Sequence, residues 1–159
     1  MSLNAYLRIS GSVQGEIKGS VMQKGKEGSI FVLAATHDLI SPVQFTGGTS
    51  SSGRARHEPF KIIKETDRAT PLLYKALVNN EVLSEFKLDF FRQTGNVVIV
   101  QNVYSVKLIN ARISGIRFEM PHAKKADTLS LNEYEELSLV YDSIEWTWHA
   151  GNVSYTATV

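Results

Sequence analysis

The segment GRARHEPFKIIKETDRATPLLYKAL, residues 53–77, decides the fold because it joins a charged strand to the one clear helix of the sequence. In its first half, Phe60 and Ile62 are two residues apart and so lie on one face of a predicted strand. We expect this strand to run from Arg54 to Lys64. Basic and acidic residues are interleaved along the segment, which favours ion pairs at a surface or a subunit interface over a site for a polyanion.

The second half of the segment predicts a short helix. Thr70 is expected to be its N-cap and Pro71 its first helical residue. The helix should have about nine residues and end at Asn79-Asn80, and a helix of that length is marginal alone. We therefore expect it to pack on a sheet through one apolar face, formed by Leu72, Leu73, Ala76 and Leu77.

Strands are predicted for most of the remaining sequence. Apolar residues alternate with polar ones over residues 3–10, 85–90 and 153–159, as in half-buried strands. The continuous apolar run from Ile30 to Thr36 indicates a strand that is buried on both faces. Residues 121–132 are expected to form a polar loop.

Two long segments change the face on which their apolar residues lie. In residues 104–120 the change falls near Leu108-Ile109 and again near Gly115, and in residues 134–148 it falls at Asp142-Ser143. A strand changes its buried face only through a bulge or bend, so we expect such a segment to leave one sheet and join another. The predicted fold is mainly β, a small antiparallel β-barrel or curved sandwich with one short flanking α-helix, in a single domain over residues 1–159.

Composition and motifs argue against several classes of function. The 17 basic and 16 acidic residues give a formal net charge of +1, so neither a nucleic-acid surface nor a membrane surface is indicated. The chain has no cysteine, which excludes disulfides and cysteine-based zinc sites. No glycine-rich stretch ends in the Gly-Lys-Ser/Thr of a phosphate-binding loop. The histidines lack metal-ligand spacing: His37, His57, His122 and His149.

We therefore expect no metal, no cofactor and no catalytic residue. A hydrolase is the alternative with the weakest support, because it rests only on scattered histidine, serine and acidic residues. The pair Glu135-Glu136 is interpreted as solvated charge at the start of a strand rather than as general acid and base.

Trp146 and Trp148 are two residues apart and so share one face of a predicted strand. They are expected to fill a core or a subunit interface. The alternative is that they stack on a ligand, in which case the protein would be a monomeric ligand-binding β-module.

The sequence resembles the Hcp family, the haemolysin-coregulated proteins that form the tube of the bacterial type VI secretion system. The resemblance covers essentially the whole chain, and its middle blocks are the most specific. It is carried by residues 15–19, 28–37, 53–60 and 64–73 and by Glu145-Trp146.

The resemblance implies a structural protein rather than an enzyme. Family members have a small β-barrel with one flanking helix, form hexameric rings and stack these rings into a tube. The implied partners are other copies of the chain, the sheath and spike of the apparatus and small effector proteins, with no nucleic acid and no membrane insertion. The start of the chain lacks a basic and then apolar signal sequence, so we expect a protein that stays in the bacterial cytoplasm before firing and is then secreted without a cleavable signal.

The resemblance also implies sites for assembly. A ring-stacking loop is expected at Thr46, Gly47, Gly48, Thr49, Ser50, Ser51, Ser52 and Gly53. Candidates for contacts between subunits are Arg54, Arg56, His57, Glu58, Lys64, Glu65, Asp67 and Arg68.

Overall fold

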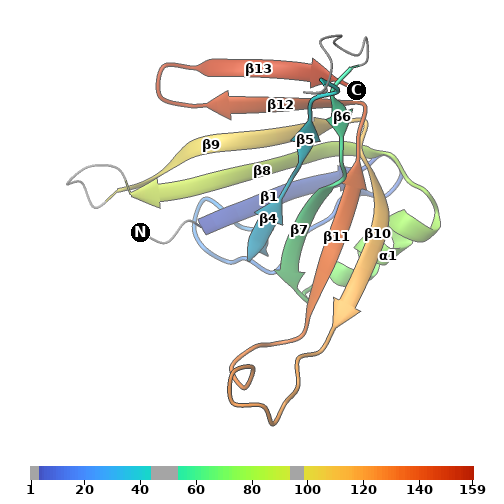
Figure 1. Ribbon diagram of the computed structural model, residues 1–159. Coiled ribbons are helices and arrows are strands. Elements are labelled where there is room, and N and C mark those ends of the chain that lie inside the picture. The colour runs from blue at the N-terminus through green and yellow to red at the C-terminus, as the bar shows by residue number, and fades with distance from the viewer. Residues whose placement is uncertain (1–3, 44–53, 94–98) are drawn as a thin grey trace.

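The computed structural model describes residues 4–43, 54–93 and 99–159, which form two main β-sheets, a small third sheet and one helix (Figure 1). The larger, seven-stranded sheet contains β1 Asn4–Gly11, β2 Gly15–Glu16, β3 Ile30–Val32, β8 Leu83–Gln93, β9 Val100–Ile109, β12 Ser143–Trp148 and β13 Val153–Thr158. The four-stranded sheet contains β4 Ala34–Thr36, β7 Phe60–Glu65, β10 Arg112–Glu119 and β11 Tyr134–Val140. The third sheet pairs β5 Leu39–Ile40 with β6 Arg56–His57, and the helix is α1 Thr70–Val78.

Neighbouring strands are antiparallel in both main sheets. The larger sheet has the order β13-β12-β9-β8-β1-β2, with β3 also paired to β1, and the smaller has the order β10-β11-β7-β4. This arrangement confirms the predicted fold class. The described helix is nine residues long, and no helix in the described ranges has the length and apolarity needed to cross a membrane.

Two of the three predicted changes of face, near Leu108-Ile109 and at Asp142-Ser143, are the places where the chain moves from one main sheet to the other. β9 of the larger sheet continues into β10 of the smaller one through Asn110, which has a positive φ of 51°. β11 returns to the larger sheet as β12 through Asp142, whose backbone N–H donates to the carbonyl of Ile109 at 3.0 Å. The bulge predicted near Gly115 is a register shift between Ile113 and Gly115.

The hydrophobic core lies between the sheets and beneath α1. Its fully buried members include Leu7, Ile62, Phe86 and Leu137, which come from both main sheets. The helix packs against β10 and buries Leu73 and Ala76, whereas Leu72 is 37% exposed. The buried face of the helix is therefore narrower than the sequence predicted.

Two strand predictions were wrong. Ile30–Thr36 is not one doubly buried strand, because β3 and β4 join different sheets and Phe31 and Leu33 are 40% and 48% exposed. The expected strand from Arg54 to Lys64 is interrupted between β6 and β7 at Pro59, which has no N–H to give to a ladder.

The start of the helix also differs from the prediction. Ala69 is the N-cap residue and makes no side-chain capping bond, and Thr70 is already helical. The hydroxyl of Thr70 accepts the backbone N–H of Asp67 at 3.0 Å, and Asp67 Oδ1 accepts the N–H of Ala69 at 2.9 Å. These two side chains stabilise the turn before the helix, so Thr70 does not cap it.

Candidate functional site

The expected subunit-interface residues lie in two groups, at opposite ends of β7 (Figure 1). A six-residue strand spans about 20 Å, so they do not form one continuous patch. The first group surrounds β6 and the second joins β7 to α1. The groups are Arg54, Arg56, His57 and Glu58, and Lys64, Glu65, Asp67 and Arg68.

The first group is largely exposed. Arg56 Nε lies 2.7 Å from Glu58 Oε1, with side chains 70% and 37% exposed, so this ion pair contributes little to the stability of one chain. Such a pair remains accessible to a neighbouring molecule. His57 is the exception, because its ring packs edge-on against Tyr141.

Lys64, in the second group, is not a surface residue. It follows Phe60 and Ile62 on the buried face of β7, and its side chain is 0% exposed. Its Nζ lies 2.7 Å from Glu135 Oε1 and 2.9 Å from Asp67 Oδ1. The structure therefore removes Lys64 from the candidates for contact with another subunit.

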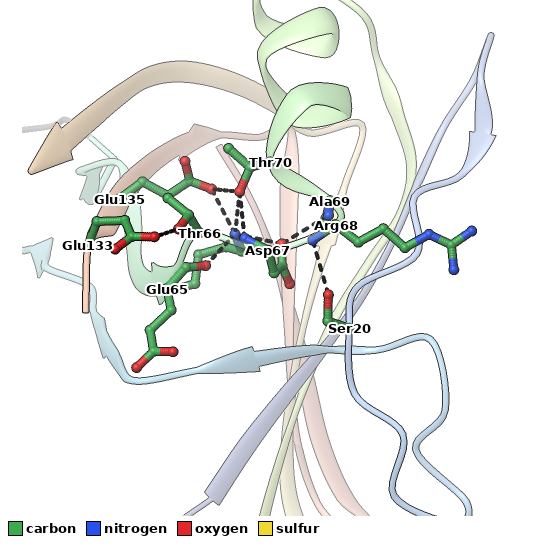
Figure 2. Close-up of polar contacts among 10 residues, drawn as sticks. Ser20, Glu65, Thr66, Asp67, Arg68, Ala69, Thr70, Glu133 and Glu135 are labelled. Carbon is green, nitrogen blue, oxygen red and sulfur yellow. Dashed lines mark hydrogen bonds and ion pairs between the residues drawn. The ribbon is translucent and has the colours of Figure 1, made fainter. Parts of the chain in front are cut away.

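Four oxygen atoms surround the Lys64 ammonium. Besides the two carboxylates, it donates to the backbone carbonyl of Glu65 at 2.8 Å and to Thr70 Oγ1 at 3.2 Å. The Thr70 hydroxyl in turn donates to Glu135 Oε1 at 2.9 Å. This lysine-centred network joins β7, the start of α1 and β11, and Figure 2 shows how its acidic and hydroxyl members converge.

Glu135 was interpreted wrongly from the sequence. It is completely buried in β11, whereas its neighbour Glu136 is only partly buried. The missed signal is the alternation of buried residues along each strand. Glu135 is at an odd position like the buried Leu137 and Leu139, just as Lys64 is at an even position like the buried Ile62.

The link between β7 and α1 is fixed on both sides. Thr66 Oγ1 donates to Glu133 Oε1 at 2.8 Å, and the Arg68 N–H donates to Ser20 Oγ at 3.0 Å (Figure 2). Hydrogen bonding to its own backbone, and then to Thr66, lowers the pKa of Glu133. The Arg68 side chain is exposed and points away from the other labelled side chains in Figure 2. Glu65 is exposed as well, so these two residues remain candidates for contacts.

The predicted stacking loop, Thr46–Gly53, lies outside the described residues. Its assignment stays a prediction.

The described residues contain one cluster of serine, histidine and aspartate, but its order is not that of a catalytic triad. Ser105 Oγ donates to Asp89 Oδ1 at 2.5 Å and lies 2.7 Å from His149 Nε2. Because the hydroxyl proton is given to Asp89, His149 must donate to the oxygen and does not act as a base. In a triad the histidine lies between the serine and the acid, and here the serine, only 3% exposed, lies between them.

The two tryptophans have different surroundings. Trp146 stacks on Tyr155, with ring centroids 6.4 Å apart and planes at 5°, and lines a cavity of about 350 Å³ together with Phe90 and Tyr104. Trp148 does not line this cavity and is 40% exposed, beside the guanidinium of Arg92. The predicted aromatic pair is therefore not a single binding face.

Comparison with known proteins identifies the family. Residues 6–148 match the family described as the type VI secretion system effector Hcp. The chain belongs to the Hcp family. This confirms the resemblance that the sequence suggested, over most of the chain.

Relatives resemble this Hcp chain over almost its whole length. The "Major exported protein" of Pseudomonas aeruginosa is 28% identical over 97% of this chain and 94% of its own. A crystal structure of an Hcp protein superimposes with a TM-score of 0.88 at 26% identity, covering 99% of this chain and 98% of its own. The Hcp1 protein of E. coli EAEC 042, in a doubly substituted form, superimposes with a TM-score of 0.85 at 28% identity, covering 99% of both chains. The secreted protein Hcp3 from Pseudomonas aeruginosa superimposes with a TM-score of 0.78 at 25% identity, covering 99% of this chain and 98% of its own.

Proposed function

We propose that this protein is a ring-forming structural subunit whose hexamers stack into the inner tube of a type VI secretion apparatus, with small effector proteins carried in the pore. The observation that carries the proposal is the similarity to an Hcp structure over 99% of the chain at a TM-score of 0.88. Assembly into a ring depends on the shape of the whole subunit, so similarity over the whole fold is the relevant kind. The proposed partners are other copies of the chain, the sheath, the spike and effectors.

The edges of the sheets support assembly on physical grounds. β13 is the last strand of the larger sheet, and β10 and β4 are the outer strands of the smaller one. Edge strands present backbone hydrogen-bonding groups that must be paired, covered or blocked. Near these edges Tyr155 and Met120 are 69% and 67% exposed. Contacts around a rotation axis would cover such surfaces, because head-to-tail interfaces that close form rings.

The exposed members of the two charged groups are the proposed contacts between subunits. Arg56 and Glu58 lie at one end of β7, and Glu65 and Arg68 lie at the other. Residues at opposite ends of β7 suit contacts with two different neighbours. Charged pairs at such contacts favour the correct register more than they add affinity.

The loop Thr46–Gly53 is proposed to contact the next ring of the tube. Its small residues cannot form a core, which suits a segment whose contacts are made with a partner. Deleting Thr49–Ser52 should leave the ring intact and weaken stacking, so sedimentation should show single rings in place of the larger stacked assemblies. Loss of the hexamer itself on this deletion would show that the assignment is wrong.

We further propose that the protein is secreted from the bacterial cytoplasm. The similarity to the "Major exported protein" of Pseudomonas aeruginosa supports export. The same proposal makes the protein structural rather than catalytic, and the order of Asp89, Ser105 and His149 is consistent with that role.

Light scattering on the purified protein tests the proposal. A hexamer should have about six times the 17.7 kDa mass of one chain. A strict monomer at high concentration would contradict it.

A monomeric ligand-binding module is the second candidate, favoured only by the cavity beside Trp146. Titration of sugars, oligonucleotides and peptides should then change the tryptophan fluorescence, and Trp146→Phe should remove that change while Trp148→Phe keeps it. An unchanged signal with every ligand class would exclude this candidate.

A further inference from the structure

One hydroxyl group fastens the β5–β6 hairpin to the body of the protein. Tyr141 Oη lies 2.7 Å from His37 Nε2 and 2.8 Å from His57 Nδ1. His37 lies between β4 and β5, and His57 is in β6, so the hydroxyl contacts both sides of the hairpin at its base. Both imidazole rings also pack on the Tyr141 ring, with centroids 5.8 and 5.6 Å away.

Tyr141 is a rigid anchor for this contact. It is buried at the point where the chain crosses from β11 to β12. The next residue, Asp142, holds the crossing through backbone hydrogen bonds with Ile109 and Val159 at 3.0 and 2.8 Å. Burial raises the pKa of Tyr141 to about 12, so the hydroxyl keeps its proton throughout the physiological range.

The number of protons in this cluster limits its charge. A tyrosine hydroxyl has one proton, so it donates to one ring nitrogen and accepts from the other. The hydroxyl proton therefore has an acceptor only while at least one imidazole presents an unprotonated nitrogen to Tyr141. When both facing nitrogens carry protons, two N–H groups point at the same buried oxygen, and the hydroxyl proton loses its acceptor.

We propose that His37, Tyr141 and His57 form a pH-sensitive latch, which holds the β5–β6 hairpin against the body near neutral pH and releases it on acidification. Histidine is the side chain whose ordinary pKa suits a switch in this range. The element we expect to be released is the hairpin, which Tyr141 fastens to the body through both histidines and which His37 also holds by packing on Phe60.

Other charged groups nearby modify the latch without replacing it. Desolvation, followed by the charge of His57, lowers the pKa of His37, while Asp38 and the backbone of Glu58 raise it by less. The Glu58 carboxylate forms an ion pair with Arg56. A polar cavity beside His37 is lined by Asp38 and Lys61. Asp142 directly follows Tyr141 in the sequence.

The sign of the effect follows from the lowered pKa. The folded hairpin favours neutral His37, so its contribution is complete above the pKa of the unfolded chain. That contribution is lost as the pH falls through that pKa and then through the lower folded one.

Amide hydrogen exchange in the full-length protein tests the latch directly. After correction for the intrinsic exchange rate, protection of residues 39–40 and 56–58 should fall about tenfold from neutral pH to one unit below the ordinary histidine pKa. Amides in β1 and β8, which pair over eight positions, should keep their protection and serve as the internal control.

Two variants separate the latch from general acid sensitivity. His37→Gln keeps an acceptor for the Tyr141 hydroxyl but does not titrate, so the hairpin should stay protected at both pH values. Tyr141→Phe removes the shared hydroxyl, so the hairpin should be unprotected at both. Equal hairpin protection of the unmodified protein at the two pH values would overturn the proposal. An unchanged pH dependence in His37→Gln would overturn it as well, even if Tyr141→Phe proves too unstable to purify.

Discussion

Lys64 Nζ lies 2.7 Å from Glu135 Oε1, and both side chains are 0% exposed. Burying two charges is costly, and their attraction compensates only when the geometry is good and the remaining hydrogen-bonding groups are satisfied. Here Asp67 and Thr70 supply further oxygen partners to the ammonium. Glu135 Oε2 is a buried atom without a hydrogen-bond partner in the described structure. Because the oxygen partners of the ammonium come from β7, β11 and the start of α1, the network holds the helix start in one geometry relative to these two strands.

Removing one member of this pair should be strongly destabilising. We expect Lys64→Met to lower the free energy of unfolding by about 3–5 kcal/mol, because it leaves Glu135 charged and buried. The double substitution Lys64→Met with Glu135→Leu should recover most of that loss. Denaturant unfolding at one fixed protein concentration measures both effects.

The matched control for that prediction is Lys61→Met on the exposed face of the same strand. It should change the free energy of unfolding by no more than about 0.5 kcal/mol. If Lys64→Met proves as mild as this control, the buried pair does not hold the helix start.

The Thr70 hydroxyl should matter through its hydrogen bonds and not through helix capping. Thr70→Val keeps the shape but leaves the Asp67 N–H and Glu135 with one partner fewer, so we expect a loss of about 1–3 kcal/mol. Thr70→Ser retains the hydroxyl and should lose much less. Thermal unfolding of the two variants compares them, and equal losses would speak against the bridging role.

The sequence pattern places Lys64 and Glu135 on the buried faces of their strands, but their pairing can be inferred only when the two strands are considered together. The period of two placed Lys64 with Phe60 and Ile62, and Glu135 with Leu137. Lys64 and Glu135 were nevertheless expected to be exposed, because lysine and glutamate are rarely buried unless they are paired. The pairing itself depends on the register of β7 against β11, where Lys64 faces Glu135, and no local pattern specifies that register.

A second buried carboxylate, that of Glu81, requires glycine at position 11. Glu81 Oε2 accepts the N–H groups of Val13 and Gln14, both at 3.0 Å, and a Cβ atom added to Gly11 would collide with this carboxylate. We expect Gly11→Ala to cost about 1–3 kcal/mol in denaturant unfolding. Gly115→Ala is the control, because nothing lies within 4 Å of its added Cβ. Equal stability of these two variants would contradict the role of Glu81.

The lowered pKa of His37 predicts how stability depends on pH. Below the ordinary histidine pKa the unfolded chain binds a proton that the folded chain resists, so the free energy of unfolding should fall on acidification. His37→Gln should reduce this slope, because glutamine does not titrate. Denaturant midpoints at a series of pH values give the slope, and identical slopes for the two proteins would rule out a contribution from His37.

The fold was more predictable than the site, for a physical reason. At the crossings near Asn110 and Asp142, the apolar residues switch from even to odd positions or back, and a regular strand does not do this. The break between β3 and β4 leaves no such mark, because Leu33 keeps the run apolar while the chain changes sheets. The Tyr141 contacts with His37 and His57 join residues 104 and 84 positions apart, so only the folded chain brings them together.

Electron microscopy of the purified protein is the most direct test of the proposed ring. We expect class averages to show rings with sixfold symmetry and a central hole, and side views at high concentration to show stacked rings. Particles the size of a single 17.7 kDa chain at every concentration, with no ring among them, would contradict the proposed function.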